Sequence, residues 1–132
     1  MAARDTPNAS APARSRSRYA GEVNRADLSI SLRSTPAEAV ITLVGEIDML
    51  TVPRLSQTVS EVLGTDPPPR VVLDLTDVTF CDSQGLGTLV VLSRKATMAQ
   101  SCLVLSNVGD FLLRVLDITG LRGALMIQEA AA

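Results

Sequence analysis

Two kinds of apolar segment alternate along this chain, and their order most constrains its fold. One kind places hydrophobic residues at strand spacing or in unbroken β-branched runs; the other repeats them every three or four residues, as in a helix with one buried face. The expected strands are 28–32, 40–44, 71–75, 102–105 and 125–127, and the expected helices are 52–64, 83–95 and 108–120. This β-β-α-β-α-β-α-β order predicts an α/β fold whose sheet is mixed, mostly parallel and flanked by helices.

Local signals mark the ends of the predicted helices. Thr51 is predicted to cap the first helix, with Pro53 in its first turn and Gly64 at its end. The third helix is expected to stop at Gly120. The residues that this helix is expected to bury are Phe111, Leu112, Val115 and Leu116.

Composition divides the chain into a domain and two tails. Residues 1–25 are rich in Arg, Ser, Ala and Pro without hydrophobic periodicity, which predicts a flexible tail. Residues 26–128 form the expected domain, and 129–132 a short C-terminal tail. The net charge of −2 divides into +3 on the first 25 residues and −5 on the rest. An acidic domain argues against direct nucleic-acid binding, which needs clustered basic side chains.

Several function classes are excluded by missing residue types. The chain has no histidine, so it has no Ser-His-Asp triad and no histidine-ligated zinc, and we expect neither a catalytic residue nor a metal. Cys81 and Cys102 are expected to lie too far apart for a disulfide, with Cys81 a small buried hydrophobe. No apolar run is long enough to insert into a membrane, and no secretory signal is visible, so we expect a cytoplasmic protein.

The segment Phe80–Gly87 lies where a buried strand gives way to a helix, an edge at which α/β proteins commonly meet ligands and partners. Ser83 is expected at the helix start, where a serine either caps free backbone N–H groups or accepts a modification. Gly85 and Gly87 weaken a first turn, and we interpret them as allowing another backbone to approach. Lys95 lies about three turns away, so no base activates Ser83 as a nucleophile. The serine is therefore expected to be acted on by another protein.

Three motifs in the expected order resemble the STAS domain of anti-sigma factor antagonists. The segment Asp82–Gly87 is similar to the phosphorylation motif of that family. Gly45-Glu-Ile-Asp48 resembles its Gly-Glu-hydrophobic-Asp signature, and Leu116–Leu121 resembles the end of its third helix. The resemblance covers residues 27–127. It differs at Gln84, where Ser or Thr is common, and at Gln128–Ala132, where the family usually continues into a fourth helix.

The resemblance implies a phosphorylation switch with no cofactor of its own. Ser83 would be the phosphoacceptor of an anti-sigma factor that is itself an ATP-dependent serine kinase. The unphosphorylated protein would bind this kinase and release a sigma factor, and a serine phosphatase would reset it. We expect a monomer or weak dimer. The residues expected to contact the kinase are Asp48, Asp82, Gln84, Gly85, Leu86 and Gly87. The alternative is an unphosphorylated STAS scaffold subunit of a membrane transport or other multiprotein complex.

Overall fold

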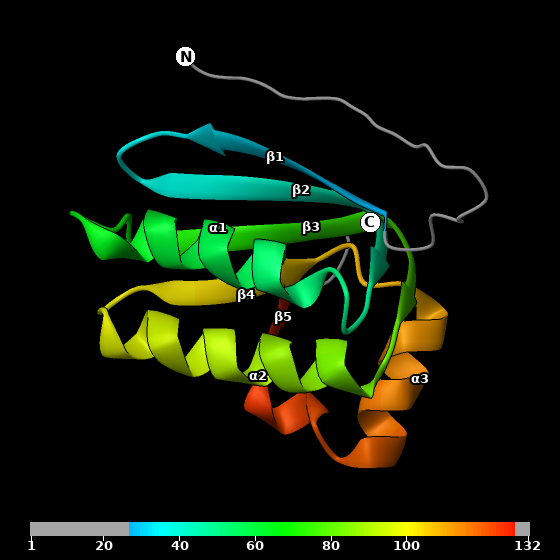
Figure 1. Cartoon of the computed structure of the whole chain (residues 1–132). Helices are drawn as coiled ribbons and strands as arrows, with labels where there is room; N and C mark the ends of the chain where they lie inside the picture. The colour runs from blue at the N-terminus through cyan, green and yellow to red at the C-terminus, as the bar shows by residue number, and fades with distance from the viewer. Residues whose placement is uncertain (1–26, 129–132) are drawn as a thin grey trace.

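The computed structural model describes residues 27–128, and the order of its elements is the predicted one (Figure 1). The elements are β1 (Leu28–Ser34), β2 (Glu38–Ile47), α1 (Val52–Gly64), β3 (Arg70–Cys81), α2 (Ser83–Met98), β4 (Cys102–Ser106), α3 (Asp110–Thr119), the short 3-10 helix η1 (Arg122–Ala124) and β5 (Met126–Gln128). The two predicted tails, 1–25 and 129–132, lie outside the described residues, so those boundaries stay predictions.

The five strands form one mixed sheet in the order β1-β2-β3-β4-β5. β1 and β2 pair antiparallel through the turn at Thr35, whose hydroxyl oxygen accepts hydrogen bonds from the backbone N–H groups of Ala37 and Glu38. The remaining neighbours pair in parallel. This arrangement confirms the predicted α/β class. It also brings the carboxyl ends of β2 and β3 to one edge of the sheet, because parallel strands run in the same direction.

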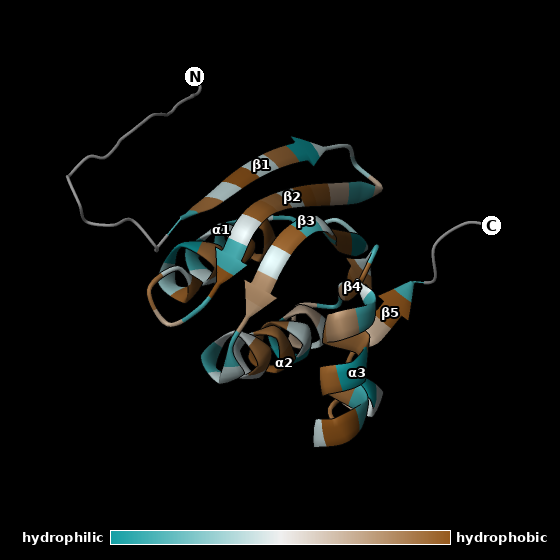
Figure 2. Cartoon of the chain, turned by 90° about the vertical axis from the view of Figure 1, so that its right-hand side faces the viewer, coloured by the Kyte–Doolittle hydropathy of each residue, from teal (hydrophilic) through white to brown (hydrophobic). Residues whose placement is uncertain are grey.

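One hydrophobic core lies between the sheet and the helices. α1 and α2 lie side by side along one face of the sheet, and α3 stands below the β4–β5 side (Figures 1 and 2). Alternate strand residues such as Ile41 and Leu73 meet Leu55 of α1, Leu89 of α2 and Leu116 of α3, and all five are fully buried. No helix among the described residues is long and apolar enough to cross a bilayer.

β3 is much longer than its hydrophobic run predicted. The run ends at Leu75, but the strand continues to Cys81 through mostly exposed residues that include Val78 and Phe80, and it stays paired with β2 across two register shifts. These shifts are β-bulges, which bend a strand and are common beside functional sites. β4 pairs with β3 only as far as Asp74 and ends at Ser106. Within the described chain, residues 75–81 therefore have no strand on their β4 side.

The expected burial of Phe111 is wrong. α3 begins at Asp110, two residues later than predicted, and buries Leu112 and Leu116 at a spacing of one turn. Phe111 lies about 100° away from that buried face, on a helix of 3.6 residues per turn, and its side chain is 64% exposed. Val115 is half-buried. The helical periodicity of this segment was correctly recognised, but the buried face of α3 is narrower than predicted and excludes Phe111.

Gly85 in the first turn of α2 provides the close backbone approach that the sequence predicted. A Cβ atom there would lie 2.7 Å from the carbonyl oxygen of Ile47 and 2.8 Å from Sγ of Cys81. The approaching backbone is therefore the end of β2 in the same chain. A Cβ atom on Gly87 would meet nothing within 4 Å. The two glycines thus have different roles, and only Gly85 is required by packing.

This difference predicts opposite effects of one added methyl group. Gly85→Ala should lower the free energy of unfolding by about 1–3 kcal/mol, because the methyl group collides with a fixed carbonyl. Gly87→Ala, the matched control, should leave it unchanged or raise it by up to about 1 kcal/mol, because alanine favours helix. Urea unfolding of both variants beside the wild type measures the two values. Equal effects at the two positions would contradict the assigned packing.

Candidate functional site

Asp82 connects the two loops that meet at the carboxyl edge of the sheet. It is the N-cap residue of α2, and its Oδ1 accepts a hydrogen bond of 2.8 Å from the backbone N–H of Gly85. Its Oδ2 accepts one of 3.2 Å from the N–H of Met49, in the loop after β2. Its own N–H donates to the carbonyl of Ile47 at 3.0 Å. One residue thus holds the start of α2 against the end of β2.

The loop between β2 and α1 is held by Asp48 and Thr51. Oδ1 of Asp48 accepts hydrogen bonds from the backbone N–H groups of Leu50 and Thr51, at 3.0 and 3.1 Å. Thr51 occupies the N-cap position but makes no side-chain cap bond, contrary to prediction. Its buried hydroxyl instead donates to the carbonyl of Glu46 at 2.8 Å and accepts from the N–H of Asp48 at 2.9 Å. The carboxylate of Asp48 therefore orders its own turn, at the same edge as Ser83.

Ser83 is the first residue of α2, and its side chain is exposed. The capping role that would explain an ordinary serine here belongs to Asp82 instead. Within the described chain, no hydrogen bond holds the Ser83 hydroxyl. The helix N-terminus offers free backbone N–H groups and a partial positive charge beside it, which favour an anion. The position therefore presents a free hydroxyl where an added phosphate is electrostatically tolerated.

The expected contact residues divide into exposed and buried groups. Gln84 and Gly87 are exposed beside Ser83, and Asp82 is half-buried. Gly85 and Leu86 are buried in the core, so they support the first turn from beneath and offer little surface to a partner. Lys95 is twelve positions further along α2, about 18 Å away at 1.5 Å per residue.

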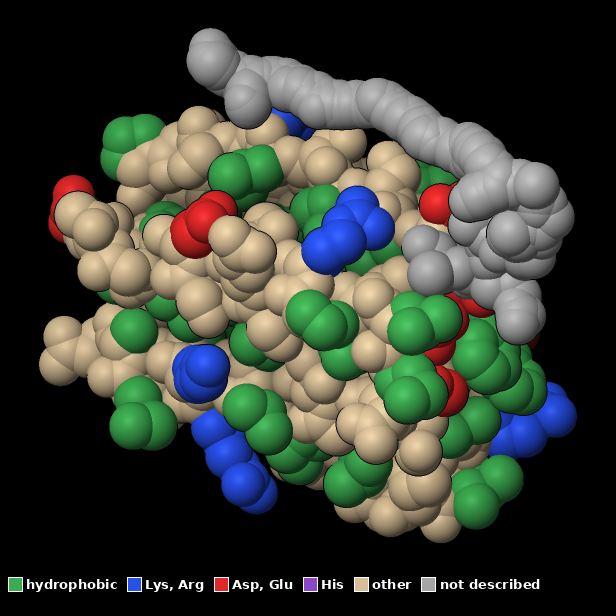
Figure 3. Space-filling view, in the orientation of Figure 1, with side chains coloured by type: hydrophobic (Ala, Val, Ile, Leu, Met, Phe, Trp, Pro, Cys, Tyr) green, Lys and Arg blue, Asp and Glu red, His purple; other side chains and the backbone are tan. Residues whose placement is uncertain are grey.

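Apolar side chains around this edge were missed by the sequence analysis. Met49 and Leu50 are 64% and 62% exposed in the loop after β2, and Phe80 at the end of β3 is 44% exposed. Figure 3 shows hydrophobic and acidic side chains side by side at the right-hand end of the molecule. Two consecutive apolar residues in a loop were the available signal, because a loop usually carries polar residues.

Cys81 is a buried thiol with no reactive character. Burial, and secondarily the charge of Asp82, raises the pKa of Cys81 to about 12. Cys102 pairs in register with Arg70, at the opposite end of β3, and both cysteines are free. The two cysteines therefore lie at opposite ends of the sheet, and the expectation that they form no disulfide is confirmed. No group of His, Cys, Asp and Glu among the described residues has the arrangement of a metal site.

Comparison with known proteins agrees with this geometry. The family model described as "Mlab, STAS domain" matches residues 30–128. An anti-sigma-B factor antagonist of Listeria monocytogenes is 33% identical over 104 residues, which are 78% of this chain and 90% of that protein.

Solved structures show the same fold. An anti-sigma factor antagonist from Mycobacterium paratuberculosis has a TM-score of 0.68 and 28% identity, covering 79% of this chain and 87% of that one. The antagonist SpoIIAA in its unphosphorylated form has a TM-score of 0.66 and 21% identity, covering 78% and 89%. Its phosphorylated form has a TM-score of 0.62, covering 78% and 92%. With the 33% identical Listeria relative, these matches identify the family. The chain belongs to the STAS domain family of anti-sigma factor antagonists.

Proposed function

We propose that this protein is an anti-sigma factor antagonist switched by phosphorylation of Ser83. The unphosphorylated form binds an anti-sigma factor that is also a serine kinase, and thereby releases a sigma factor. Phosphorylation of Ser83 ends that binding, and a separate serine phosphatase restores it. Sigma factors act in the cytoplasm, where this exchange would take place. The observation that carries the proposal is the exposed Ser83 hydroxyl at a helix N-terminus whose capping is already done by Asp82.

The partner supplies the chemistry in this scheme. The kinase would bring ATP, so the antagonist needs no cofactor and performs no catalysis. Without histidine in the chain and with Lys95 at the far end of α2, nothing nearby activates Ser83 as a nucleophile. The hydroxyl instead attacks the terminal phosphoryl group of the kinase's ATP, and its proton passes to a base of the kinase. ADP leaves, and phosphoserine remains.

Electrostatics explain how the phosphate would break the complex. A phosphoserine carries about −1.5 to −2 charges at neutral pH. Asp82 and Asp48 already lie at this edge, and their carboxylates are occupied by backbone N–H groups. The helix N-terminus tolerates the added charge within the chain, but the phosphate then joins two carboxylates at the surface that the kinase contacts. A kinase surface that is complementary to the unmodified edge then meets like charge or a bulky group, which costs several kcal/mol.

The names of the relatives favour this function over the scaffold alternative. The Listeria relative and a Bacillus subtilis protein, 27% identical over 102 residues, are both anti-sigma-B factor antagonists. SpoIIAA has been solved in phosphorylated and unphosphorylated forms. A scaffold subunit has no use for a free hydroxyl at the start of α2.

Substitution of Ser83 tests the phosphoacceptor. Ser83→Ala should abolish phosphate incorporation by the cognate kinase while keeping its affinity, because the lost hydroxyl bonds nothing in the described chain. Ser83→Asp should bind at least about tenfold more weakly, because it fixes a charge beside Asp82. Mass spectrometry locates the phosphate, and biolayer interferometry measures the affinity. Undiminished phosphate uptake by Ser83→Ala would contradict the assignment.

Gly87 tests whether the partner approaches the first turn of α2. Gly87→Val should weaken kinase binding by at least about tenfold, because a branched side chain would project into the open space that we assign to the partner. Circular dichroism and thermal melting should show a folded protein, since no atom of this chain lies within 4 Å of the new Cβ. Thr97→Val, at an exposed position near the other end of α2, is the control and should bind like the wild type. Wild-type affinity in Gly87→Val would place the kinase elsewhere.

A further inference from the structure

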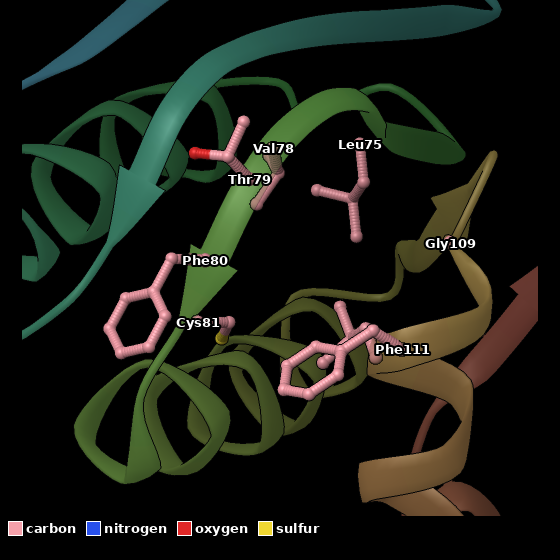
Figure 4. A pocket seen from close by; sticks show the side chains of 8 residues that line it. Leu75, Val78, Thr79, Phe80, Cys81, Gly109 and Phe111 are labelled. Carbon is pink, nitrogen blue, oxygen red and sulfur yellow. The ribbon is translucent and has the colours of Figure 1, made fainter.

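A small apolar hollow lies beside the candidate site, and the switch described above does not use it. It lies between the second half of β3 and the start of α3, with Leu75, Val78 and Cys81 on one side and Phe111 and Leu112 on the other (Figure 4). The hollow exists because β4 ends opposite Asp74, whereas β3 continues to Cys81. The missing length of strand leaves apolar side chains facing a gap.

The size of the hollow selects the kind of group that fits. Its volume is about 80 Å³. Pockets for drug-sized ligands measure about 300–1,000 Å³, so this one is too small for such a ligand. A single aliphatic or aromatic side chain inserted from a neighbouring protein is of suitable size. Phe111, 64% exposed at the rim, adds an aromatic surface of the kind that dominates binding energy at protein interfaces.

Charge around the hollow indicates the chemistry of the protein that would insert this side chain. The hollow opens at the carboxyl edge of the sheet. Six carboxylates lie on the residues near this edge, Asp27, Glu46, Asp48, Asp77, Asp82 and Asp110, against two guanidinium groups, Arg54 at the start of α1 and Arg114 of α3, so acidic groups are in the majority. The basic residues Arg94 and Lys95 of α2 lie toward the opposite end, near its C-terminus. A partner segment that carries Lys or Arg beside an apolar residue is complementary to such an edge.

The hollow is lined by a residue that lies two positions before the phosphoacceptor in the chain. Cys81 lines the hollow, and Asp82 and Ser83 follow it directly in the chain. In Figure 4 the Phe80 ring extends from β3 away from the Phe111 ring, so the two aromatic residues flank the end of this strand on opposite sides. The short chain distance from Cys81 to Ser83 places the hollow within the same region of the surface as the phosphoacceptor.

We propose that the hollow between β3 and α3 is a second docking site for the kinase that phosphorylates Ser83, which inserts one apolar side chain flanked by basic residues. This inference rests on the proposed function. Docking at α3 would orient the kinase on the antagonist, while its catalytic site engages the first turn of α2. The hollow is distinct from the phosphoacceptor, so substitutions in it should lower the affinity of the unphosphorylated form without removing the hydroxyl that accepts the phosphate.

The test compares two exposed apolar residues of the same helix. Phe111→Asp should weaken binding of the kinase about tenfold or more, because it removes the aromatic rim and adds a charge to an apolar contact. Phe111→Leu should restore most of the affinity. Ile118→Asp, 77% exposed at the other end of α3, should bind like the wild type. Each purified variant is titrated against the ATP-dependent anti-sigma factor kinases of the source organism by biolayer interferometry, after its fold is checked by thermal melting.

The outcomes separate this inference from the proposed function. Phosphorylation of Ser83 with equal affinity for Phe111→Asp and Ile118→Asp would overturn the docking site and leave the switch intact. Binding that depends on Phe111 without phosphate on Ser83 would support the docking site and overturn the switch. A Phe111-dependent dimer of the protein alone, seen by analytical ultracentrifugation, would assign the hollow to a second copy and overturn the proposal. Failure of every kinase to bind the wild type would overturn both proposals.

A second measurement tests whether the partner segment is basic. The association rate of wild type and kinase should fall as salt is raised from low to physiological concentration, because the Debye length shortens to about 8 Å. The dissociation rate of Phe111→Asp should exceed that of the wild type at each salt concentration, because insertion of a side chain holds the complex after encounter. A salt-independent association rate would contradict the basic character assigned to the partner segment.

Discussion

The carbonyl group of Ile47 is the contact on which the geometry of this protein's functional edge depends. It accepts a hydrogen bond from the N–H of Asp82, and its oxygen lies only 2.7 Å from the position that a Cβ on Gly85 would take. The start of α2 is therefore pressed against the end of β2 as closely as two backbones allow. Asp82 completes the junction by bonding Gly85 on one side and Met49 on the other. Because its carboxylate does the capping, the neighbouring serine is left free for a partner.

The second half of β3, which has no neighbour on its β4 side in the described chain, leaves apolar side chains accessible at this edge. A strand that extends beyond its neighbour exposes unpaired backbone groups and side chains. Proteins usually prevent such strands from pairing with other chains by bulges, by charged residues or by a covering element. Here bulges bend the strand, Asp77 places a charge on it, and α3 approaches but leaves a hollow. At the opposite end, Arg70 bonds both Glu38 of β2 and Gln128 of β5. One end of the sheet is thus joined by polar side chains from β2, β3 and β5, whereas the other end combines hydrogen-bonded loops and carboxylates with an open apolar hollow.

The features that followed from hydrophobic spacing were predictable from the sequence. The order of elements, the parallel crossovers and the position of Ser83 at the start of a helix depend on apolar periodicity and helix signals, which act locally. The end of β3 was not predictable, because hydrophobic and polar residues hardly alternate in its last positions. These residues are kept in the strand by pairing with β2 across bulges. Thr51 was misassigned because its hydroxyl bonds the carbonyl of Glu46, a partner that only the folded loop supplies. Phe111 lies at the margin of a helical face, where one residue of rotation decides between core and solvent.

The free hydroxyl of Ser83 has a further consequence for the lifetime of the protein. A group that interacts equally in the folded and unfolded chain does not shift the folding equilibrium when it is modified. The hydroxyl bonds nothing in the described chain, and a phosphate at a helix N-terminus adds only about 0.3–1 kcal/mol. The populations of opened chain in the two forms should therefore differ by no more than about fivefold. In the proposed switch, the ratio of the two forms would then be set mainly by the rates of the kinase and the phosphatase, and only weakly by unequal turnover of the two forms.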